Sequence, residues 1–276
     1  MSTPAARPLA VVTGASSGIG LELARECARH GHDLVLVAQH GADDALAAVR
    51  AESADGQVLL ADLATSAGVE EVASGVAALG RPVDVLALNA GLGLGGRFVP
   101  APDGPDAQDT DLDDELRLIA VNVTSTVHLA KRLLPAMVAR GSGRVLITSS
   151  ISGTQPTTFE AVYGGTKAFQ LSFAESLRAE LEGSGVTVTA LLPGPTDTDF
   201  FRRGRMDDTV VGSELKTQTS PAEVARQGYA AMMAGEDQVT GGTWAVKLQR
   251  QLNRLLPETV AARRHRAVAE PGATEG

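Results

Sequence analysis

Residues 9–20 read LAVVTGASSGIG, a short run of β-prone residues that passes into a glycine-rich turn, and a helical pattern follows and stops at Gly31. The glycine spacing is Gly-x-x-x-Gly-x-Gly, over Gly14, Gly18 and Gly20, a variant of the commoner dinucleotide fingerprint. Glycines let the backbone approach a phosphate closely, and the free N–H groups of the new helix stabilise the anion. The stretch predicts a strand, a turn and a helix that hold a phosphate, although packing alone also places glycines at such corners.

The same turn, residues 14–18, also satisfies the Gly-x-Ser-x-Gly elbow of serine hydrolases. That elbow normally follows several strands and needs an oxyanion loop upstream, whereas this turn follows the first strand of the chain. In such hydrolases the catalytic serine is followed along the chain by the acid and then by the histidine. Here that order would require a distant histidine such as His265. We therefore favour the phosphate-binding interpretation.

Further strands of the buried type are predicted over residues 33–38, 58–60, 83–88, 143–148 and 186–192, with a last one over 238–245. Helical patterns over 42–51 and 67–79 alternate with the first of them. This alternation predicts a single α/β domain with a doubly wound, mostly parallel seven-stranded sheet and helices on both faces. Ligands of such sheets bind at the carboxyl ends of the strands.

Composition excludes several classes of protein. A formal charge of -9 and a pI near 5.1 argue against nucleic acid or an anionic membrane surface as the main partner. The single cysteine, Cys27, permits no internal disulfide and is expected in the core, which favours a cytoplasmic protein. No stretch approaches the roughly 20 apolar residues of a membrane span, and the five histidines show no metal-ligand spacing.

A second motif begins with SSISG at residues 149–153 and ends with YGGTK at 163–167. If residues 161–182 are helical, Tyr163 and Lys167 share one face. An ammonium group favours the phenolate, so Tyr163 could exchange a proton with a substrate. Taken alone, the pair is as easily an exposed helix pair. Asn122, in the middle of an apolar helix, indicates a buried hydrogen-bonding task.

With these residues assembled, the chain resembles the short-chain dehydrogenase/reductase family of nicotinamide-dependent oxidoreductases over roughly residues 9–245. The resemblance implies a Rossmann-type fold and a catalytic tetrad of Asn122, Ser150, Tyr163 and Lys167. Ser150 is preferred over Ser149 because it stands thirteen residues before Tyr163, the usual family interval. The cofactor-binding residues that the resemblance implies are Gly14, Ser16, Ser17, Gly18, Ile19, Gly20, Gln39, His40, Asp62, Leu63, Asn89, Ala90, Gly91, Tyr163, Lys167, Pro193, Gly194 and Thr198.

The resemblance also implies a mechanism: hydride passes between the cofactor and a carbonyl or alcohol carbon, without a metal. Ser150 would hydrogen-bond the oxygen, and Tyr163 would act as general acid or base. Lys167 would hold the ribose and lower the pKa of Tyr163, while Asn122 would anchor a water-mediated proton relay. The alternative is a cofactor-binding protein that has lost catalysis and serves regulation or assembly, which the intact tetrad disfavours.

Cofactor choice in this fold is set at the end of the second strand, where an acid binds the ribose of NAD and an arginine the 2′-phosphate of NADP. Here Ala38, Gln39 and His40 offer neither. The absence of an acid favours NADP(H), with NAD(H) possible. By resemblance we also expect a homodimer or homotetramer that forms through the helices of Asn122 and Tyr163. The substrate is a small carbonyl or alcohol compound whose identity the sequence does not give.

The predicted organisation has three parts, and the second contains a substrate loop. Residues 1–8 form a disordered N-terminus, and 9–245 form the Rossmann-type domain. A substrate loop covers about 196–219, and a polar helical tail covers 246–276. Residues 100–113 are expected to form an exposed loop, because proline, glycine and aspartate dominate them.

Overall fold

The computed structural model describes residues 7–100, 102, 108–206, 209, 219–253 and 257–270. In these residues seven strands form one sheet in the order β3-β2-β1-β4-β5-β6-β7, and every neighbouring pair is parallel. The strands are β1 (Leu9–Thr13), β2 (Asp33–Ala38), β3 (Gly56–Leu60), β4 (Val83–Leu88), β5 (Gly143–Thr148), β6 (Val186–Pro193) and β7 (Gln238–Gly241). The predicted fold class is confirmed, with a sheet that is parallel throughout.

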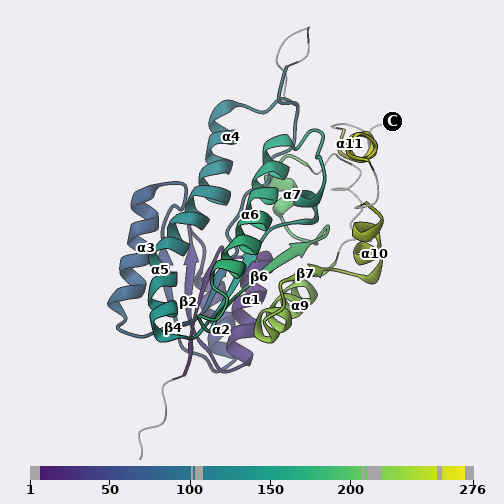
Figure 1. Ribbon diagram of the computed structural model, residues 1–276. Coiled ribbons are helices and arrows are strands. Elements are labelled where there is room, and N and C mark those ends of the chain that lie inside the picture. Colours follow the sequence, from purple (N-terminus) through teal and green to yellow (C-terminus); the bar gives the residue numbers. More distant parts are fainter. Residues whose placement is uncertain are drawn as a thin grey trace, which may run out of the picture.

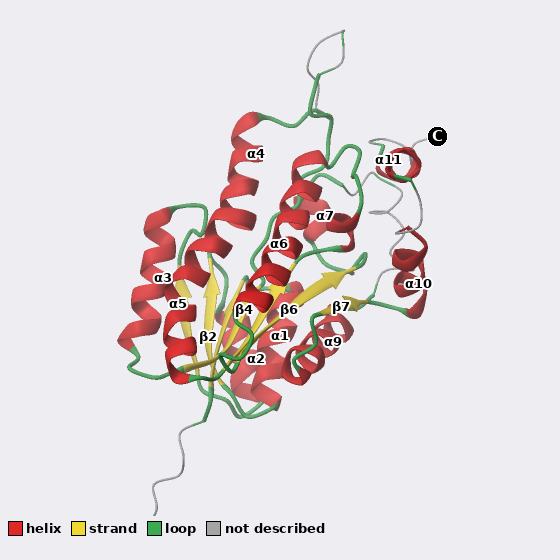
Figure 2. Ribbon diagram, in the orientation of Figure 1, coloured by secondary structure: helices red, strands yellow, loops and turns green. Residues whose placement is uncertain are grey.

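Helices cover both faces of this sheet (Figures 1 and 2). One face packs against α1 (Gly18–Arg29), α2 (Asp43–Ala51) and α9 (Pro221–Ala234), and the other against α3 (Ser66–Ala78), α5 (Ser125–Arg140) and α6 (Ala161–Glu180). Side chains alternate along each strand between the two cores, because successive residues of a strand point to opposite faces. Val11 belongs to the α3–α5–α6 core and Val12 to the α1–α2–α9 core.

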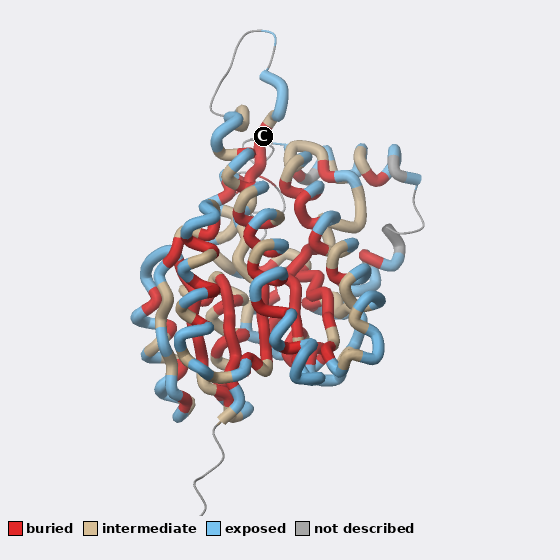
Figure 3. The backbone as a smooth tube through the Cα atoms, turned by 60° about the vertical axis from the view of Figure 1, so that its left-hand side comes forward, coloured by how far each residue is buried: buried red, intermediate tan, exposed pale blue. Residues whose placement is uncertain are grey.

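Burial follows this layering. In Figure 3 the buried segments run through the middle of the molecule, and the exposed ones lie on its outside. Cys27 lies in the core beneath α1, as the sequence predicted.

The long helix predicted around Asn122 is divided by a π-helical turn. α4 (Leu112–Ile119) passes into η1 (Ala120–Thr124), and α5 continues from Ser125. A π turn inserts one residue into the helical ladder and is found frequently at functional sites. The turn carries Asn122, which is completely buried.

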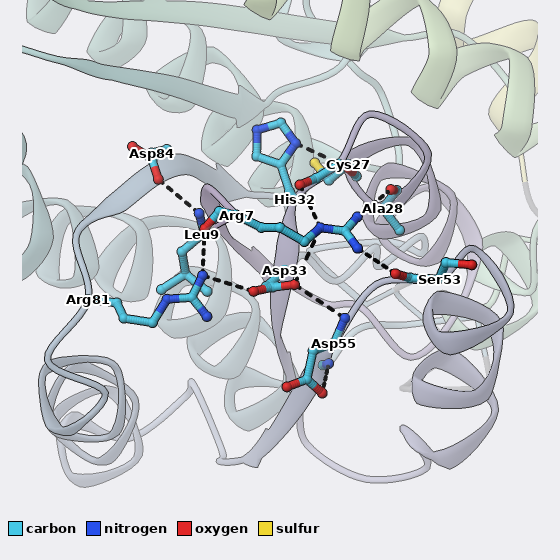
Figure 4. Close-up of polar contacts among 12 residues, drawn as sticks. Arg7, Leu9, Cys27, Ala28, His32, Asp33, Ser53, Asp55, Arg81 and Asp84 are labelled. Atoms are coloured by element: carbon cyan, nitrogen blue, oxygen red, sulfur yellow. Dashed lines mark hydrogen bonds and ion pairs between the residues drawn. The ribbon is translucent and has the colours of Figure 1, made fainter. Parts of the chain in front are cut away.

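The amino ends of β1 and β2 are tied together by charged groups (Figure 4). Asp33 forms an ion pair with Arg81 at 2.9 Å and a longer one with Arg7 at 3.6 Å. Asp84 accepts a hydrogen bond from the backbone N–H of Leu9 at 2.8 Å. Arg7 was expected in the disordered N-terminus, but these contacts fix it; residues 1–6 lie outside the described residues.

The chain after β6 differs most from the predicted elements. β7 ends at Gly241 rather than at residue 245. Gly242 turns the chain with a φ of +146°, and the carbonyl of Thr243 then accepts a hydrogen bond from the N–H of Lys247, which begins a helix. In the polar helical tail predicted over 246–276 the structure describes two helices, α10 (Trp244–Asn253), which begins two residues earlier, and α11 (Glu258–Ala269). Parts of the two predicted loops lie outside the described residues, namely 101, 103–107, 207, 208 and 210–218.

Candidate active site

The glycine turn lies at the point where the strand order reverses, between β1 and β4. A Cβ on Gly20 would lie 2.0 Å from the carbonyl oxygen of Gly14, and one on Gly14 would lie 2.9 Å from Cα of Ala90. Larger residues therefore cannot occupy these two positions without moving the backbone. The first turn of α1 has no side-chain cap, since Ser17 at the N-cap makes no capping hydrogen bond. Its N–H groups are available to an anion.

Asn89 holds three strand ends together at this edge. Its Nδ2 donates to the carbonyl of Thr13 at 3.1 Å, and its Oδ1 accepts from Oγ1 of Thr148 at 3.1 Å. The Thr13 hydroxyl accepts from the N–H groups of Asn89 and Ala90, each at 2.9 Å. The ends of β1, β4 and β5 are thereby locked in place around one crevice.

A cavity of about 290 Å³ opens at these strand ends. It joins the glycine turn to the second sequence motif, because residues of both line it. The lining residues are Gly14, Ser16 to Gly20, Asn89 to Gly91, Thr148 to Ser152, Gln155, Glu160, Tyr163, Lys167, Pro193 to Thr196, Thr198, Phe200, Phe201, Arg203, Met206 and His265.

Tyr163 and Ser150 meet inside this cavity. The pKa of Tyr163 is raised by burial, and a hydrogen bond with the Ser150 side chain partly opposes the rise. Ser149 has a different task, since its hydroxyl donates to the backbone carbonyl of Lys167 at 2.7 Å. The ring of Tyr163 packs against Phe200 with centroids 5.6 Å apart.

Lys167 is buried and lies 5.8 Å from the centre of the Tyr163 ring. Burial lowers the pKa of Lys167 to about 7. Burial is the largest influence on the pKa of both groups, and the lowering of the Tyr163 pKa by Lys167 stays a prediction. At neutral pH the ammonium is therefore only partly populated, and its partners decide its charge.

Gln170 is one of those partners, and sequence reasoning missed it. The Lys167 ammonium donates to Oε1 of Gln170 at 2.8 Å and to the carbonyl of Thr148 at 3.1 Å. Nε2 of Gln170 then donates to Oγ1 of Thr126 at 3.3 Å, and Thr126 donates to the carbonyl of Asn122 at 2.9 Å. Side chains thus connect Lys167 to the backbone of Asn122, and the water-mediated relay expected at Asn122 stays a prediction.

The side chain of Asn122 serves its neighbours rather than Lys167. Its Oδ1 accepts from the N–H of Leu92 at 2.8 Å, and its Nδ2 donates to the carbonyl of Leu92 at 3.0 Å and to Oγ1 of Thr166 at 2.9 Å. These bonds fix the segment after β4 against the helix of Tyr163. Asn122 is therefore a positioning residue in this geometry.

The profile of the short chain dehydrogenase family matches residues 8–208. The chain belongs to this family. The dehydrogenase is 32% identical over 216 residues to an NADP-dependent 3-hydroxy acid dehydrogenase of Salmonella typhi, a match that covers 77% of this chain and 83% of that one. It is 31% identical over 222 residues to sulfoacetaldehyde reductase 2 of Chromohalobacter salexigens, with 78% and 83% covered.

Solved structures agree with this membership. A short-chain dehydrogenase from Sphingobium yanoikuyae in complex with NADPH superposes on the dehydrogenase with a TM-score of 0.75 and 30% identity. The match covers 92% of this chain and 98% of that one. The predicted oxidoreductase function is confirmed, and the hydrolase and non-catalytic interpretations are set aside.

Four residues that the sequence assigned to the dehydrogenase's cofactor do not line the cavity: Gln39, His40, Asp62 and Leu63. Gln39 and His40 are exposed after β2, and Leu63 is buried. Asp62 accepts two hydrogen bonds from Arg117, at 3.0 and 3.1 Å, and one from the N–H of Ala64. Sequence reasoning missed Arg117, because it lies in α4 and reaches Asp62 only in the fold.

The segment after β6 covers the cavity of the dehydrogenase. Its short helix α7 (Phe200–Arg203) places Phe200 against Tyr163, and Arg203 donates to Oγ of Ser17 at 3.4 Å. Met206 is buried beneath it. Sequence reasoning expected a loop here but gave no role to Arg203, nor to Glu160, and it considered His265 only for a hydrolase.

In the described part of the dehydrogenase, no helix combines the length and apolar character needed to cross a bilayer. Nor do three or more His, Cys, Asp or Glu side chains gather there as a metal site would require. The prediction that catalysis needs no metal stays a prediction.

Proposed function

We propose that this enzyme is an NADP(H)-preferring short-chain dehydrogenase/reductase of small carbonyl or alcohol compounds, with Tyr163 as the general acid or base. The observation that carries the proposal is the meeting of Tyr163, Ser150 and Lys167 in one cavity with the glycine turn. The cavity lies at the strand-order switch point, where open parallel sheets bind ligands. A purified sample that oxidises NADPH only in the presence of a carbonyl compound would support it.

The residues present fit a nicotinamide dinucleotide. The uncapped first turn of α1, together with the steric need for glycine at positions 14 and 20, leaves a cradle for a pyrophosphate. Arg203, which contacts Ser17, adds a positive charge to that end. When bound there, the cofactor supplies or accepts the hydride.

The chemistry that falls to the protein is the handling of one proton. Ser150 orients the substrate oxygen towards Tyr163, whose hydroxyl gives that oxygen a proton in reduction and takes it in oxidation. The Lys167 ammonium lies next to this phenol and stabilises negative charge on it. Gln170 and Thr148 accept two of the three N–H bonds of the ammonium, and Lys167 lines the cavity. These roles require no other ionisable group.

The preference for NADP(H) is supported by the names of relatives and by the end of β2. The Salmonella enzyme is NADP-dependent, and the Sphingobium structure holds NADPH. After β2 the exposed Gln39 and His40 offer no carboxylate that would repel a 2′-phosphate. His40 is the residue there that can carry a positive charge.

The substitution His40→Ala is therefore expected to weaken NADPH binding about threefold to tenfold and to leave NADH binding unchanged. Fluorescence titration of both cofactors at fixed salt measures this difference. His128→Ala is the matched control, since His128 of α5 pairs with Glu70 of α3 and does not line the cavity. An equal loss for both cofactors would remove His40 as the basis of the preference.

A homodimer through α4, α5 and α6 is supported by apolar side chains that these helices leave exposed. α4 exposes Leu112 and Leu116, with 70% and 53% of their surface accessible. On α6, Phe169 is exposed and stacks on Phe173 at 5.7 Å. Exposed apolar surface of this kind marks interaction sites.

We expect light scattering at micromolar concentration to give the mass of two or four chains. A double substitution, Leu112→Glu with Leu116→Glu, should shift the mass towards one chain, because it puts charge into the proposed interface. The matched control is Leu60→Glu, which changes a leucine of 60% exposure on β3. A wild-type protein with the mass of one chain would contradict the proposed interface.

A further inference from the structure

Two ionisable side chains that line the cavity have no role in the proposed mechanism. Glu160 lies one helical turn before Tyr163, at the N-cap of α6, and His265 comes from the middle of α11. Both line the cavity. They belong to segments far apart in sequence, and Figure 1 shows α11 near α7 at the carboxyl-end edge of the sheet.

Specific contacts join α11 to the loop that precedes Glu160. Oγ1 of Thr158 donates to the carbonyl of Ala262 at 3.0 Å, and the carbonyl of Thr158 binds Nδ1 of His265 at 3.1 Å. The guanidinium of Arg266 lies 5.7 Å above the ring of Phe159. Helix α11 is thereby docked on the loop that precedes Glu160.

The loop itself is held in an uncommon backbone conformation. Phe159 has a φ of +64°, a value that L-residues other than glycine seldom adopt, and its carbonyl accepts from the N–H of Gly96 at 2.8 Å. Thr157 further binds the carbonyl of Glu160 at 2.9 Å. Strain of this kind persists where the surroundings enforce it, often at ligand sites. Here it presents Glu160 to the cavity.

Both side chains present hydrogen-bond acceptors. Among the described residues the carboxyl group of Glu160 has no hydrogen-bond or ion-pair partner. Burial lowers the pKa of His265, so its ring is neutral. Because Nδ1 of the neutral ring donates to the Thr158 carbonyl, Nε2 is left with a lone pair.

The two cationic side chains that line the cavity in the described part of the chain are held by groups other than Glu160 and His265. Lys167 is held by Thr148 and Gln170, and Arg203 lies at the glycine turn against Ser17. The groups closest to Tyr163 on the covering side are apolar, with Phe200 in contact with its ring. A half-buried carboxylate in such surroundings is costly unless a ligand brings it a donor.

We propose that the substrate of this enzyme carries a hydrogen-bond donor, best an ammonium group, close to its carbonyl or alcohol carbon, and that Glu160 and His265 bind this donor. The proposal rests on the proposed function. It makes Glu160 the residue that selects cationic over neutral and anionic substrates, since a charged carboxylate attracts the first and repels the last.

Binding can be tested without turnover, because NADPH and an alcohol cannot react with each other. Three probes of similar size differ in one group: 1-amino-2-propanol is a cation, 2-butanol is neutral and 3-hydroxybutyrate is an anion. Each is titrated into the protein–NADPH complex at pH 8 and followed by NADPH fluorescence. Burial raises the pKa of Glu160 to about 7, so its carboxyl group is mostly ionised at pH 8.

The wild-type complex should bind the amino alcohol about tenfold or more tightly than 2-butanol, and the anion most weakly. Glu160→Gln, which keeps the shape of the side chain, should remove this preference, and His265→Phe should reduce it about threefold. Glu175→Gln, an exposed residue of the same helix α6, should leave it unchanged. Melting temperatures establish that each variant is folded.

Equal affinity of the wild-type complex for the three probes, or tighter binding of the anion, would overturn the proposal. So would a preference for the amino alcohol that survives Glu160→Gln. A separate assay follows NADPH oxidation with 1-aminopropan-2-one and with butanone. If neither ketone is reduced while the binding preference is present, the proposed reaction fails and the binding site for the donor stands.

Discussion

Replacing Tyr163 by phenylalanine is expected to lower kcat of carbonyl reduction by about 10² to 10⁴-fold, the range of a lost general acid. The substitution removes only the hydroxyl. The ring that packs against Phe200 at 5.6 Å is retained, so the cavity keeps its shape. Steady-state NADPH oxidation with one carbonyl compound measures the loss, and NADPH fluorescence shows that the cofactor still binds.

The chain offers a matched control for this experiment. Its other tyrosine, Tyr229, lies in α9 on the opposite face of the sheet and stacks on His30 with centroids 4.4 Å apart. Tyr229→Phe removes the same hydroxyl from a place outside the cavity, so kcat should be unchanged. Turnover of Tyr163→Phe close to the wild-type rate would refute the role assigned to Tyr163.

Gln170→Leu is expected to lower kcat about tenfold to a hundredfold, the range found when a group that orients a catalytic centre is removed. Leucine is apolar, so the Lys167 ammonium loses the acceptor that holds it at 2.8 Å in a fully buried place. The reason is electrostatic: without that acceptor the charged form of Lys167 is less stable, and its pKa falls below about 7.

The pH profile separates this role from simple packing. If the charged form of Lys167 is the active one, lowering its pKa moves the alkaline limb of kcat to lower pH. Gln170→Glu places a carboxylate beside the ammonium, raises that pKa, and moves the same limb to higher pH. Opposite shifts of the two variants are the expected result.

A merely structural Gln170 would give a different outcome. Both variants would then lower the melting temperature and kcat, and the alkaline limb would stay where it is in the wild type. Shifts in the same direction would likewise contradict the positioning of Lys167 by Gln170. The comparison uses one carbonyl compound, saturating NADPH and constant ionic strength.

The candidate site could be predicted in part from the sequence, because several of its features are local. The glycine turn at residues 14–20 follows from the spacing of small residues, and Tyr163 and Lys167 share a helix face because they stand four apart. The parallel sheet follows from alternating strands and helices. Ser150 was distinguished from Ser149 by an interval alone, and the two hydroxyls do have different partners.

Errors arose where the chain is shaped by distant contacts. The last strand was predicted too long, since Gly242 and Thr243 turn the chain into α10. The sequence showed that Lys167 and Tyr163 are close but not that both are buried, and burial raises the pKa of Tyr163 and lowers that of Lys167. Gln170 carries no signal in the sequence, where it reads as one more polar residue of α6.

The sequence by itself thus determined the order of strands and helices along the chain, the glycine turn and the groups that we propose to handle the proton. These depend on residue type and on spacings of a few residues, which local geometry fixes. Only the tertiary structure decided which side chains share the cavity. The Lys167–Gln170–Thr126 chain joins α6 to α5, and α11 adds His265 to the cavity that Glu160 also lines. Such meetings depend on how separate elements pack, and no local pattern encodes them.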